Sequence, residues 1–147
     1  MNLLLESGKS LLEGSKNNLS LLSNASAFLK AYIPDLNWAG FYLYEQDKLI
    51  LGPFQGLPAC VEIEVGKGVC GTSFEQKRVL NVIDVHQFDG HIACDSNSNS
   101  ELVVPLYKNG KPIGVLDIDS PLFNRFDSDL EAFFVAFAKV VIDLYEI

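Results

Sequence analysis

The chain has 147 residues, 48% of them hydrophobic and 20% charged, and these proportions are typical of one folded domain rather than of a disordered chain. Its formal net charge of −8, without any run of basic residues, argues against a nucleic acid or an anionic membrane surface as the partner. The sequence contains neither an apolar stretch long enough to span a bilayer nor the cationic start of a signal peptide, so we expect a cytosolic protein.

The first half of the chain is predicted to form two amphipathic helices and then three strands. In the helices apolar residues recur at steps of three and four, and Pro34 ends the second helix because proline cannot continue it. In the strands apolar residues alternate with others, and Gln46 and Asp47 have the place of a hairpin turn between the first two. The predicted helices are residues 3–12 and 17–33, and the predicted strands are 38–44, 48–54 and 60–65.

The second half of the chain is predicted to place two helices and three strands around one long loop. Asn109 and Gly110 form the strongest short-range hairpin signal, since both tolerate the positive φ angles of a tight turn. Asp127 is a good candidate to cap the last helix, which carries its apolar residues on one stripe. The predicted helices are residues 69–77 and 127–145, and the predicted strands are 79–83, 101–107 and 113–119.

This order of elements favours an α+β fold, because hairpins stand where a doubly wound fold would need crossover connections. We predict a central, mostly antiparallel six-stranded sheet with helices packed against it. The sequence shows no internal repeat and no linker, so residues 1–147 are expected to form a single domain. Its N-terminal helices lie within residues 1–34, and residues 37–145 hold the sheet, the active-site loop and the C-terminal helix.

Residues 90–100 form a polar loop in which Ile92 is the single large apolar residue. Long loops without periodicity of their own are usually functional or disordered. A disordered loop would rarely hold Cys94 directly after Ile92 and Ala93. We therefore interpret this loop, including its polar part at residues 95–100, as the wall of a functional site.

The three cysteines are Cys60, Cys70 and Cys94, and an odd number fits a reducing compartment better than a disulfide framework. Free cysteines usually behave as small buried hydrophobic residues, and these spacings match neither a CxxC redox pair nor a zinc ribbon. Each cysteine, however, lies beside a turn or loop, which favours thiol–disulfide chemistry. Cys70 lies in the first turn of a predicted helix, where backbone amides stabilise a thiolate, so this argument alone nominates Cys70 as the nucleophile.

Asp117 and Asp119 point to the same side of their predicted strand, because side chains alternate along a strand. Two like charges this close raise the pKa of at least one carboxyl group. The plain alternative is an edge strand that ends in water. Glu101 begins the neighbouring strand of the same hairpin, so pairing across Asn109 and Gly110 brings it towards the end of the strand that holds residues 117–119. A cluster of three acids beside the Cys94 loop is harder to explain as ordinary surface.

Trp38 and Tyr42 lie on one face of the first predicted strand, and Gly40 between them leaves a gap. Core packing is the default explanation for such a pair. A groove with aromatic walls, suited to an apolar or sulfur-containing ligand, is the sharper alternative.

Two other candidate sites are rejected because of their spacing. Gly66, Lys67 and Gly68 lack the pattern of a phosphate-binding loop. His86 and His91 give no close ligand pair of the zinc-ribbon kind with the cysteines, so we expect neither a metal nor another cofactor.

Five segments of the chain together resemble the free methionine-(R)-sulfoxide reductases, which are small single-domain enzymes with a GAF fold. The segments are NWAGFYLYE, LGPFQGLPAC, GKGVCGTS, DGHIACDSNSNSELVVPL and GVLDIDSP. The resemblance extends from Asn37 to Leu130 and includes the spacings of the three cysteines. It implies a GAF-like α+β domain that reduces free methionine (R)-sulfoxide to methionine and so acts under oxidative stress.

The resemblance also implies roles for the cysteines. The attacking cysteine of the family corresponds to Cys94, which becomes a sulfenic acid, while Cys60 is the main resolving partner and Cys70 is able to take part. Thioredoxin then reduces the disulfide, and the family suggests a homodimer. We prefer Cys94 to Cys70 as the nucleophile, because Cys94 lies in the loop that leads into the acidic hairpin.

The acids have a role because a sulfoxide oxygen is a weak base and needs a proton donor, which a carboxylic acid kept neutral by burial can be. The resemblance assigns proton donation and the binding of the substrate ammonium to Glu101, Asp117 and Asp119 without dividing these roles. We expect Glu101 and Asp119 to flank the sulfoxide oxygen. Trp38 and Tyr42 correspond to residues that line the pocket around the methylthio end, and backbone amides near the loop are expected to hold the substrate carboxylate.

Two alternative functions remain open at this point. One is a non-catalytic GAF sensor module that binds a small molecule and passes a signal to an output domain. The other is a structural zinc module, which would require bound metal.

Overall fold

A computed structural model of the protein describes every residue except Ala93 and Asp95, two positions of the predicted polar loop that lie outside the described residues. Within the described part, four α-helices, a short 3₁₀ helix and six strands follow one another. None of the helices in this part of the chain is long and apolar enough to cross a membrane. The helices are α1 (Asn2–Leu12), α2 (Asn18–Tyr32), α3 (Gly68–Gln76), the 3₁₀ helix η1 (Val85–Gln87) and α4 (Ser128–Leu144), and the strands are β1 (Trp38–Glu45), β2 (Lys48–Gly56), β3 (Glu62–Glu64), β4 (Leu80–Val82), β5 (Ser100–Lys108) and β6 (Lys111–Ser120).

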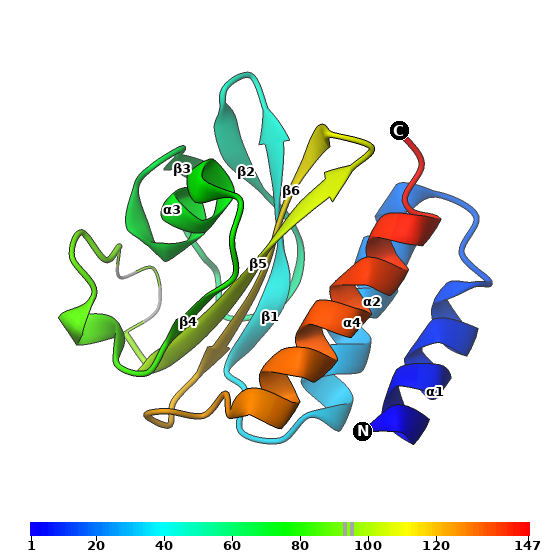
Figure 1. Ribbon diagram of the computed structural model, residues 1–147, viewed down its shortest axis with the longest axis horizontal. Coiled ribbons are helices and arrows are strands. Elements are labelled where there is room, and N and C mark those ends of the chain that lie inside the picture. Colours follow the sequence, from blue (N-terminus) through cyan, green and yellow to red (C-terminus); the bar gives the residue numbers. More distant parts are fainter. Residues whose placement is uncertain (93, 95) are drawn as a thin grey trace.

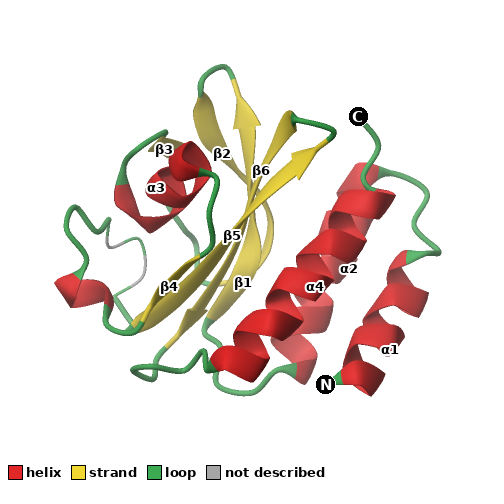
Figure 2. Cartoon of the chain, in the orientation of Figure 1, coloured by secondary structure: helices red, strands yellow, loops and turns green. Residues whose placement is uncertain are grey.

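The strands form one sheet in the order β3-β2-β1-β6-β5-β4, and every neighbouring pair in it is antiparallel. Helices α2 and α4 pack against one face of the sheet with α1 beside them, whereas α3 lies over the other face (Figures 1 and 2). This confirms the α+β fold predicted from the hairpins. Strands β1 and β6 lie in the middle of the sheet, so that their side chains are covered on both faces.

Alternation along β6 separates the main core from the α3 side of the sheet. Leu116 and Ile118 are fully buried in the core beneath α2 and α4. Asp117 and Asp119 therefore face the opposite side, where they line a pocket next to α3. The sequence pattern of this one strand thus places two acids in a second, smaller buried region.

The turns and the last helix have the local conformations that their residues predicted. Gln46, Asp47, Asn109 and Gly110 all have positive φ angles in the two hairpin turns. Asp127 caps α4, since its side chain accepts a hydrogen bond of 2.9 Å from a backbone N–H in the first turn.

Two short elements differ from the prediction. Strand β3 covers Glu62–Glu64 rather than residues 60–65, because its ladder with β2 involves these three residues alone and Cys60 is bonded elsewhere. The 3₁₀ helix Val85–Gln87 was not predicted, and it forms where the Asp84 side chain accepts a hydrogen bond from a backbone N–H of the turn.

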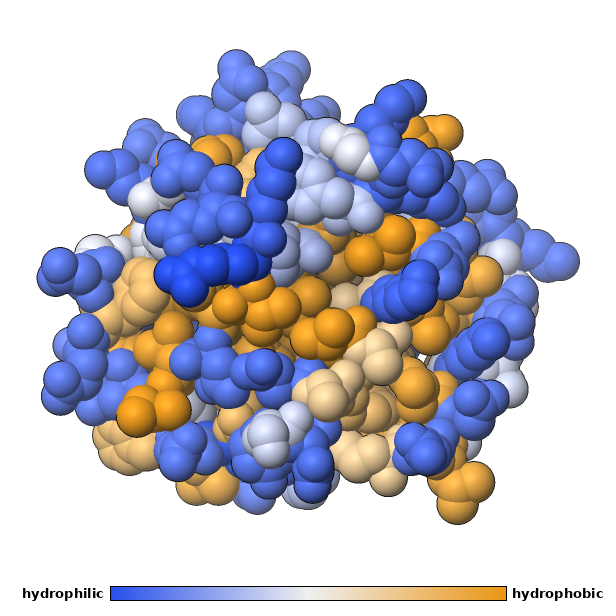
Figure 3. Space-filling view, in the orientation of Figure 1, coloured by the Kyte–Doolittle hydropathy of each residue, from blue (hydrophilic) through white to orange (hydrophobic). Residues whose placement is uncertain are grey.

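Part of the apolar surface remains exposed. On the face shown in Figure 3, apolar residues gather over the middle, near α4 and the β4–β5 edge of the sheet, with hydrophilic residues around them. Elsewhere, Leu57 and Val61 are 56% and 69% exposed on the segment that carries Cys60.

Candidate active site

A pocket between α3, the sheet and the loop after η1 brings together most of the residues that the sequence indicated. In this disulfide-bonded state its volume of about 40 Å³ has room for only a few water molecules. Cys60 does not line the pocket, but it forms a disulfide with Cys94, which does. The predicted site residues that line the pocket are Trp38, Tyr42, Cys70, Cys94, Glu101, Asp117 and Asp119.

The acids of the pocket lie on the two paired strands of the second hairpin. Glu101 of β5 is opposite Asp119 of β6, and Asp117 follows on the same face of β6. All three are buried, with exposed fractions of 7% for Glu101, 8% for Asp119 and 5% for Asp117. Because β6 also pairs with β1, it is not an edge strand, and the alternative of acids that end in water is wrong.

Burial and mutual repulsion keep protons on this cluster. Burial raises the pKa of Glu101 well above its ordinary value, and the neighbouring charge of Asp117 raises it further. Burial likewise raises the pKa of Asp117, and the charge of Asp119 adds to the effect. Within the described part of the chain, Oδ1 of Asp117 is buried without a hydrogen-bond partner. The cluster is therefore suited to donate protons and to accept a cationic group.

Cys70 does not have the stabilised thiolate that its place in a helix predicted. It lies in the first turn of α3, as expected, but it is 4% exposed and its Sγ is 3.8 Å from Oε2 of Glu101. Burial raises the pKa of the Cys70 thiol well above its ordinary value, and the charges of Asp117, Glu101 and Asp119 raise it further. Burial first and the nearby acids second disfavour the thiolate of Cys70, so the helix argument that nominated Cys70 as the nucleophile has no support here.

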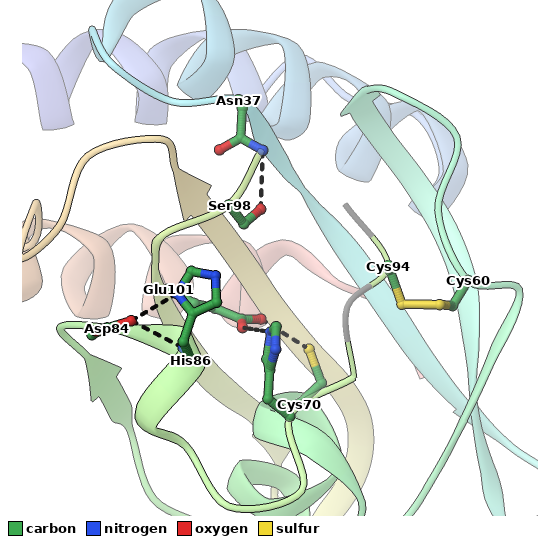
Figure 4. Close-up of polar contacts among 9 residues, drawn as sticks. Asn37, Cys60, Cys70, Asp84, His86, Cys94, Ser98 and Glu101 are labelled. Atoms are coloured by element: carbon green, nitrogen blue, oxygen red, sulfur yellow. Dashed lines mark hydrogen bonds and ion pairs between the residues drawn. A yellow bond between two sulfur atoms is a disulfide. The ribbon is translucent and has the colours of Figure 1, made fainter. Parts of the chain in front are cut away.

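Cys60 and Cys94 form a disulfide, with their Cα atoms 5.4 Å apart and a sequence separation of 34 (Figure 4). Cys70 is the remaining free cysteine and is buried. In Figure 4 the Cys70 thiol points towards Glu101. The structure therefore pairs the two cysteines that the family resemblance implied as attacking and resolving partners.

Trp38 and Tyr42 connect the sheet to the segment that carries Cys60. The hydroxyl of Tyr42 donates a hydrogen bond of 2.8 Å to the backbone carbonyl of Cys60, and Nε1 of Trp38 donates one of 3.2 Å to that of Leu57. The two rings are stacked, with centroids 5.9 Å apart. Burial, followed by the charge of Asp117, raises the pKa of Tyr42 and keeps its hydroxyl protonated as a donor.

The gap that Gly40 was expected to leave between these rings is filled. A Cβ atom at Gly40 would lie 2.3 Å from Cβ of Phe54, which belongs to the neighbouring strand β2. Phe54 also stacks on Trp38, with ring centroids 5.1 Å apart. Glycine at position 40 thus permits close packing of β2 and is not an opening of the pocket.

Sequence reasoning missed His91 as a pocket residue, because it weighed the histidines only as zinc ligands. Nε2 of His91 is 4.0 Å from Oε1 of Glu101, and its side chain is 17% exposed. Burial lowers the pKa of His91, which favours the neutral imidazole at physiological pH. His86, in contrast, lies on the surface and pairs with Asp84 at 2.9 Å (Figure 4).

The raised pKa of Asp117 predicts how stability depends on pH. The folded protein holds the Asp117 proton more tightly than the unfolded chain, so this stabilising contribution is complete below the ordinary aspartate pKa and is lost as pH rises through the folded pKa. We expect Asp117→Asn, which cannot ionise, to lose less free energy of unfolding than the parent as pH rises from about 4, the ordinary aspartate pKa, into the mildly alkaline range. Urea denaturation across this range measures it, with the exposed Asp143→Asn as control. Parallel curves for the parent and Asp117→Asn would contradict the burial of a titrating group.

Comparisons with known proteins show the family to which the chain belongs. A model of the GAF domain family matches residues 19–142. The free methionine-R-sulfoxide reductase of Escherichia coli is 55% identical over 121 residues, which cover 82% of this chain and 73% of that protein.

Solved structures match over almost the whole chain. The reduced form of fRMsr of Staphylococcus aureus has 51% sequence identity and a TM-score of 0.94, covering 99% of this chain and 94% of that one. The complex of the Staphylococcus aureus fRMsr with substrate has 50% identity and a TM-score of 0.93, covering 99% of this chain and 95% of that one.

Proposed function

Since this chain belongs to the GAF family and, within it, to the free methionine-R-sulfoxide reductases, we propose that it reduces free L-methionine (R)-sulfoxide to L-methionine. The observation that carries the proposal is the Cys60–Cys94 disulfide in the wall of a pocket that contains three buried acids. Binding of a small molecule by a non-catalytic sensor does not require a pair of cysteines that form a disulfide beside an acidic pocket, so this alternative has less support.

Cys94 is the proposed nucleophile. Its thiolate attacks the sulfoxide sulfur and forms a transient Sγ–S bond, while an acid of the pocket donates a proton to the oxygen. The oxygen then passes to Sγ as the substrate S–O bond and the Sγ–S bond break, so that Cys94 becomes a sulfenic acid and methionine leaves. The Cys94 sulfur loses the two electrons that the substrate sulfur gains. The position of Cys94 in the pocket lining and the high pKa of the alternative nucleophile, Cys70, support this choice.

Glu101 and Asp119 are the proposed proton donors to the sulfoxide oxygen. They lie opposite each other on β5 and β6, and the raised pKa of Glu101 keeps a proton available near neutral pH. Asp117 is the proposed partner of the substrate ammonium, because its buried Oδ1 has no hydrogen-bond partner among the described residues. Trp38 and Tyr42 supply the aromatic wall for the methylthio end.

Cys60 is the proposed resolving residue. Its thiol attacks the sulfur of the Cys94 sulfenic acid, the disulfide forms, and the oxygen leaves as water. A dithiol protein, thioredoxin, then reduces the disulfide and restores both thiols. Exposed Leu57 and Val61 on the segment that carries Cys60 suit contact with a protein reductant.

A cytosolic location agrees with this reductant and with the buried free thiol of Cys70. We further propose a homodimer, which the family resemblance suggests and sedimentation velocity would test.

The proposed function predicts both the stereochemistry and the size of the substrate. The protein should consume the R epimer of free methionine sulfoxide and leave the S epimer and peptide-bound sulfoxide almost untouched, because buried acids receive the free amino-acid head group. Incubation with racemic free sulfoxide and dithiothreitol, followed by separation of the remaining epimers, measures the first part. The same incubation with the N-acetylated, C-amidated compound measures the second, and equal turnover of that compound would contradict the proposal.

A further inference from the structure

Three groups in the pocket are arranged as potential metal ligands. Sγ of Cys70 and carboxylate oxygens of Glu101 and Asp117 all lie within 4.8 Å of one another, and all three residues are buried. They come from α3, β5 and β6, which are separate parts of the chain. His91 adds a fourth donor at the exposed side, with Nε2 4.0 Å from Oε1 of Glu101.

A second observation indicates that this cluster can receive a cation. Asp117 lines the pocket, and only 5% of its surface is exposed. Its Oδ1 atom has no hydrogen-bond partner among the described residues. In the same part of the chain, neither Glu101 nor Asp117 forms an ion pair with lysine or arginine. Ionisation of a buried carboxyl group without such a partner is costly, so these groups tend to hold protons, and a bound cation would take the place of those protons.

The donor set indicates the class of cation. A thiolate, two carboxylates and an imidazole suit Zn²⁺, whereas Mg²⁺ and Ca²⁺ prefer oxygen ligands alone. In a tetrahedral zinc site a sulfur and an oxygen ligand are about 3.5 Å apart. Sγ of Cys70 and Oε2 of Glu101 are already 3.8 Å apart, so that these two ligands need almost no movement.

We infer that Cys70, Glu101 and Asp117 form a binding site for one thiophilic divalent cation of the Zn²⁺ class, with His91 as the fourth ligand. Binding replaces the proton of the Cys70 thiol and any proton on the two carboxyl groups, and these protons pass to solvent. The cation would occupy the place that the proposed function gives to the substrate ammonium, and it would therefore inhibit. That consequence rests on the proposed function, whereas the binding of the cation does not.

The test uses the oxidised protein, because its disulfide leaves Cys70 as the single free thiol. Co²⁺ serves as a spectroscopic probe and Zn²⁺ as the ligand in calorimetry. We expect one Co²⁺ per chain with a thiolate-to-cobalt charge-transfer band, displacement of Co²⁺ by Zn²⁺, and release of protons in proportion to the ionisation enthalpy of the buffer. Cys70→Ser should lose the charge-transfer band, and Asp117→Asn should weaken Zn²⁺ binding by more than the roughly 100-fold that a residue outside the coordination sphere costs.

Two controls separate this site from the surface. Glu62→Gln removes an exposed acid that pairs with Lys48, and it should leave binding unchanged. His86→Ala removes the surface histidine that pairs with Asp84 and should also leave binding unchanged. Binding that survives Cys70→Ser and Asp117→Asn but is lost in His86→Ala would overturn the inference, as would the absence of a thiolate band in the parent protein. The outcome is independent of whether the protein reduces methionine sulfoxide.

Discussion

Cys94→Ser should abolish the formation of methionine even in a single turnover. Serine has nearly the shape of cysteine, but its hydroxyl is not ionised at neutral pH and does not accept the sulfoxide oxygen, so the first chemical step has no nucleophile. The prereduced variant is mixed with free methionine sulfoxide in the absence of reductant, and methionine is measured by quenched flow. The expected yield is indistinguishable from that of buffer alone.

Cys60→Ser is the matched control, since it removes the other half of the same disulfide. It should still release about one methionine per active site, because resolution of the sulfenic acid follows the chemical step. Its multiple-turnover rate should fall. If Cys94→Ser keeps the single-turnover yield and Cys70→Ser loses it, the assignment of the nucleophile is wrong.

Glu101→Gln and Asp119→Asn should each slow the first turnover by about 10²–10⁴, which is the usual value of a positioned proton donor. Each amide keeps the shape of the side chain and its ability to form hydrogen bonds, but loses the acidic proton. Both residues are buried and face each other across the hairpin, so neither is replaced by solvent in this role. Stopped-flow measurement of the sulfenic-acid-forming step gives the rate.

A parallel measurement on Glu64→Gln controls for the removal of one negative charge, because Glu64 is exposed on β3. Its rate should equal that of the parent protein. Circular dichroism of the two buried-site variants establishes that they fold. Rates close to the parent in both folded variants would show that the acids do not take part in the chemistry.

The placement of the acids could be predicted because it depends on local patterns. Alternation along the last strand put Asp117 and Asp119 on one face, and the turn at Asn109 and Gly110 brought Glu101 towards that end of the hairpin, although its pairing with Asp119 itself depends on a one-residue register shift between Leu106 and Tyr107. Both signals are contained in about twenty consecutive residues. Neither requires knowledge of how distant segments pack.

The remaining features depend on contacts between distant parts of the chain. The start of α3 was predicted correctly, but the raised pKa of Cys70 comes first from its burial and then from acids of two other strands, which the helix alone does not reveal. Phe54 fills the space beside Gly40 from the neighbouring strand, so the expected gap was wrong. His91 reaches the pocket through the loop after η1, whose course no periodic pattern describes.

The Cys60–Cys94 bond also has a mechanical consequence, because it joins the connection between β2 and β3 to the loop after η1 and encloses α3 and β4. A cross-link over 34 positions reduces the entropy of the unfolded chain by an amount worth about 4 kcal/mol in the loop-entropy model. In each proposed cycle this cross-link is made and then reduced, so the segment of chain that it encloses alternates between a cross-linked and an open form. The rate at which this segment opens locally, and hence its susceptibility to proteases, would then depend on the fraction of the enzyme that the cell keeps in the reduced form.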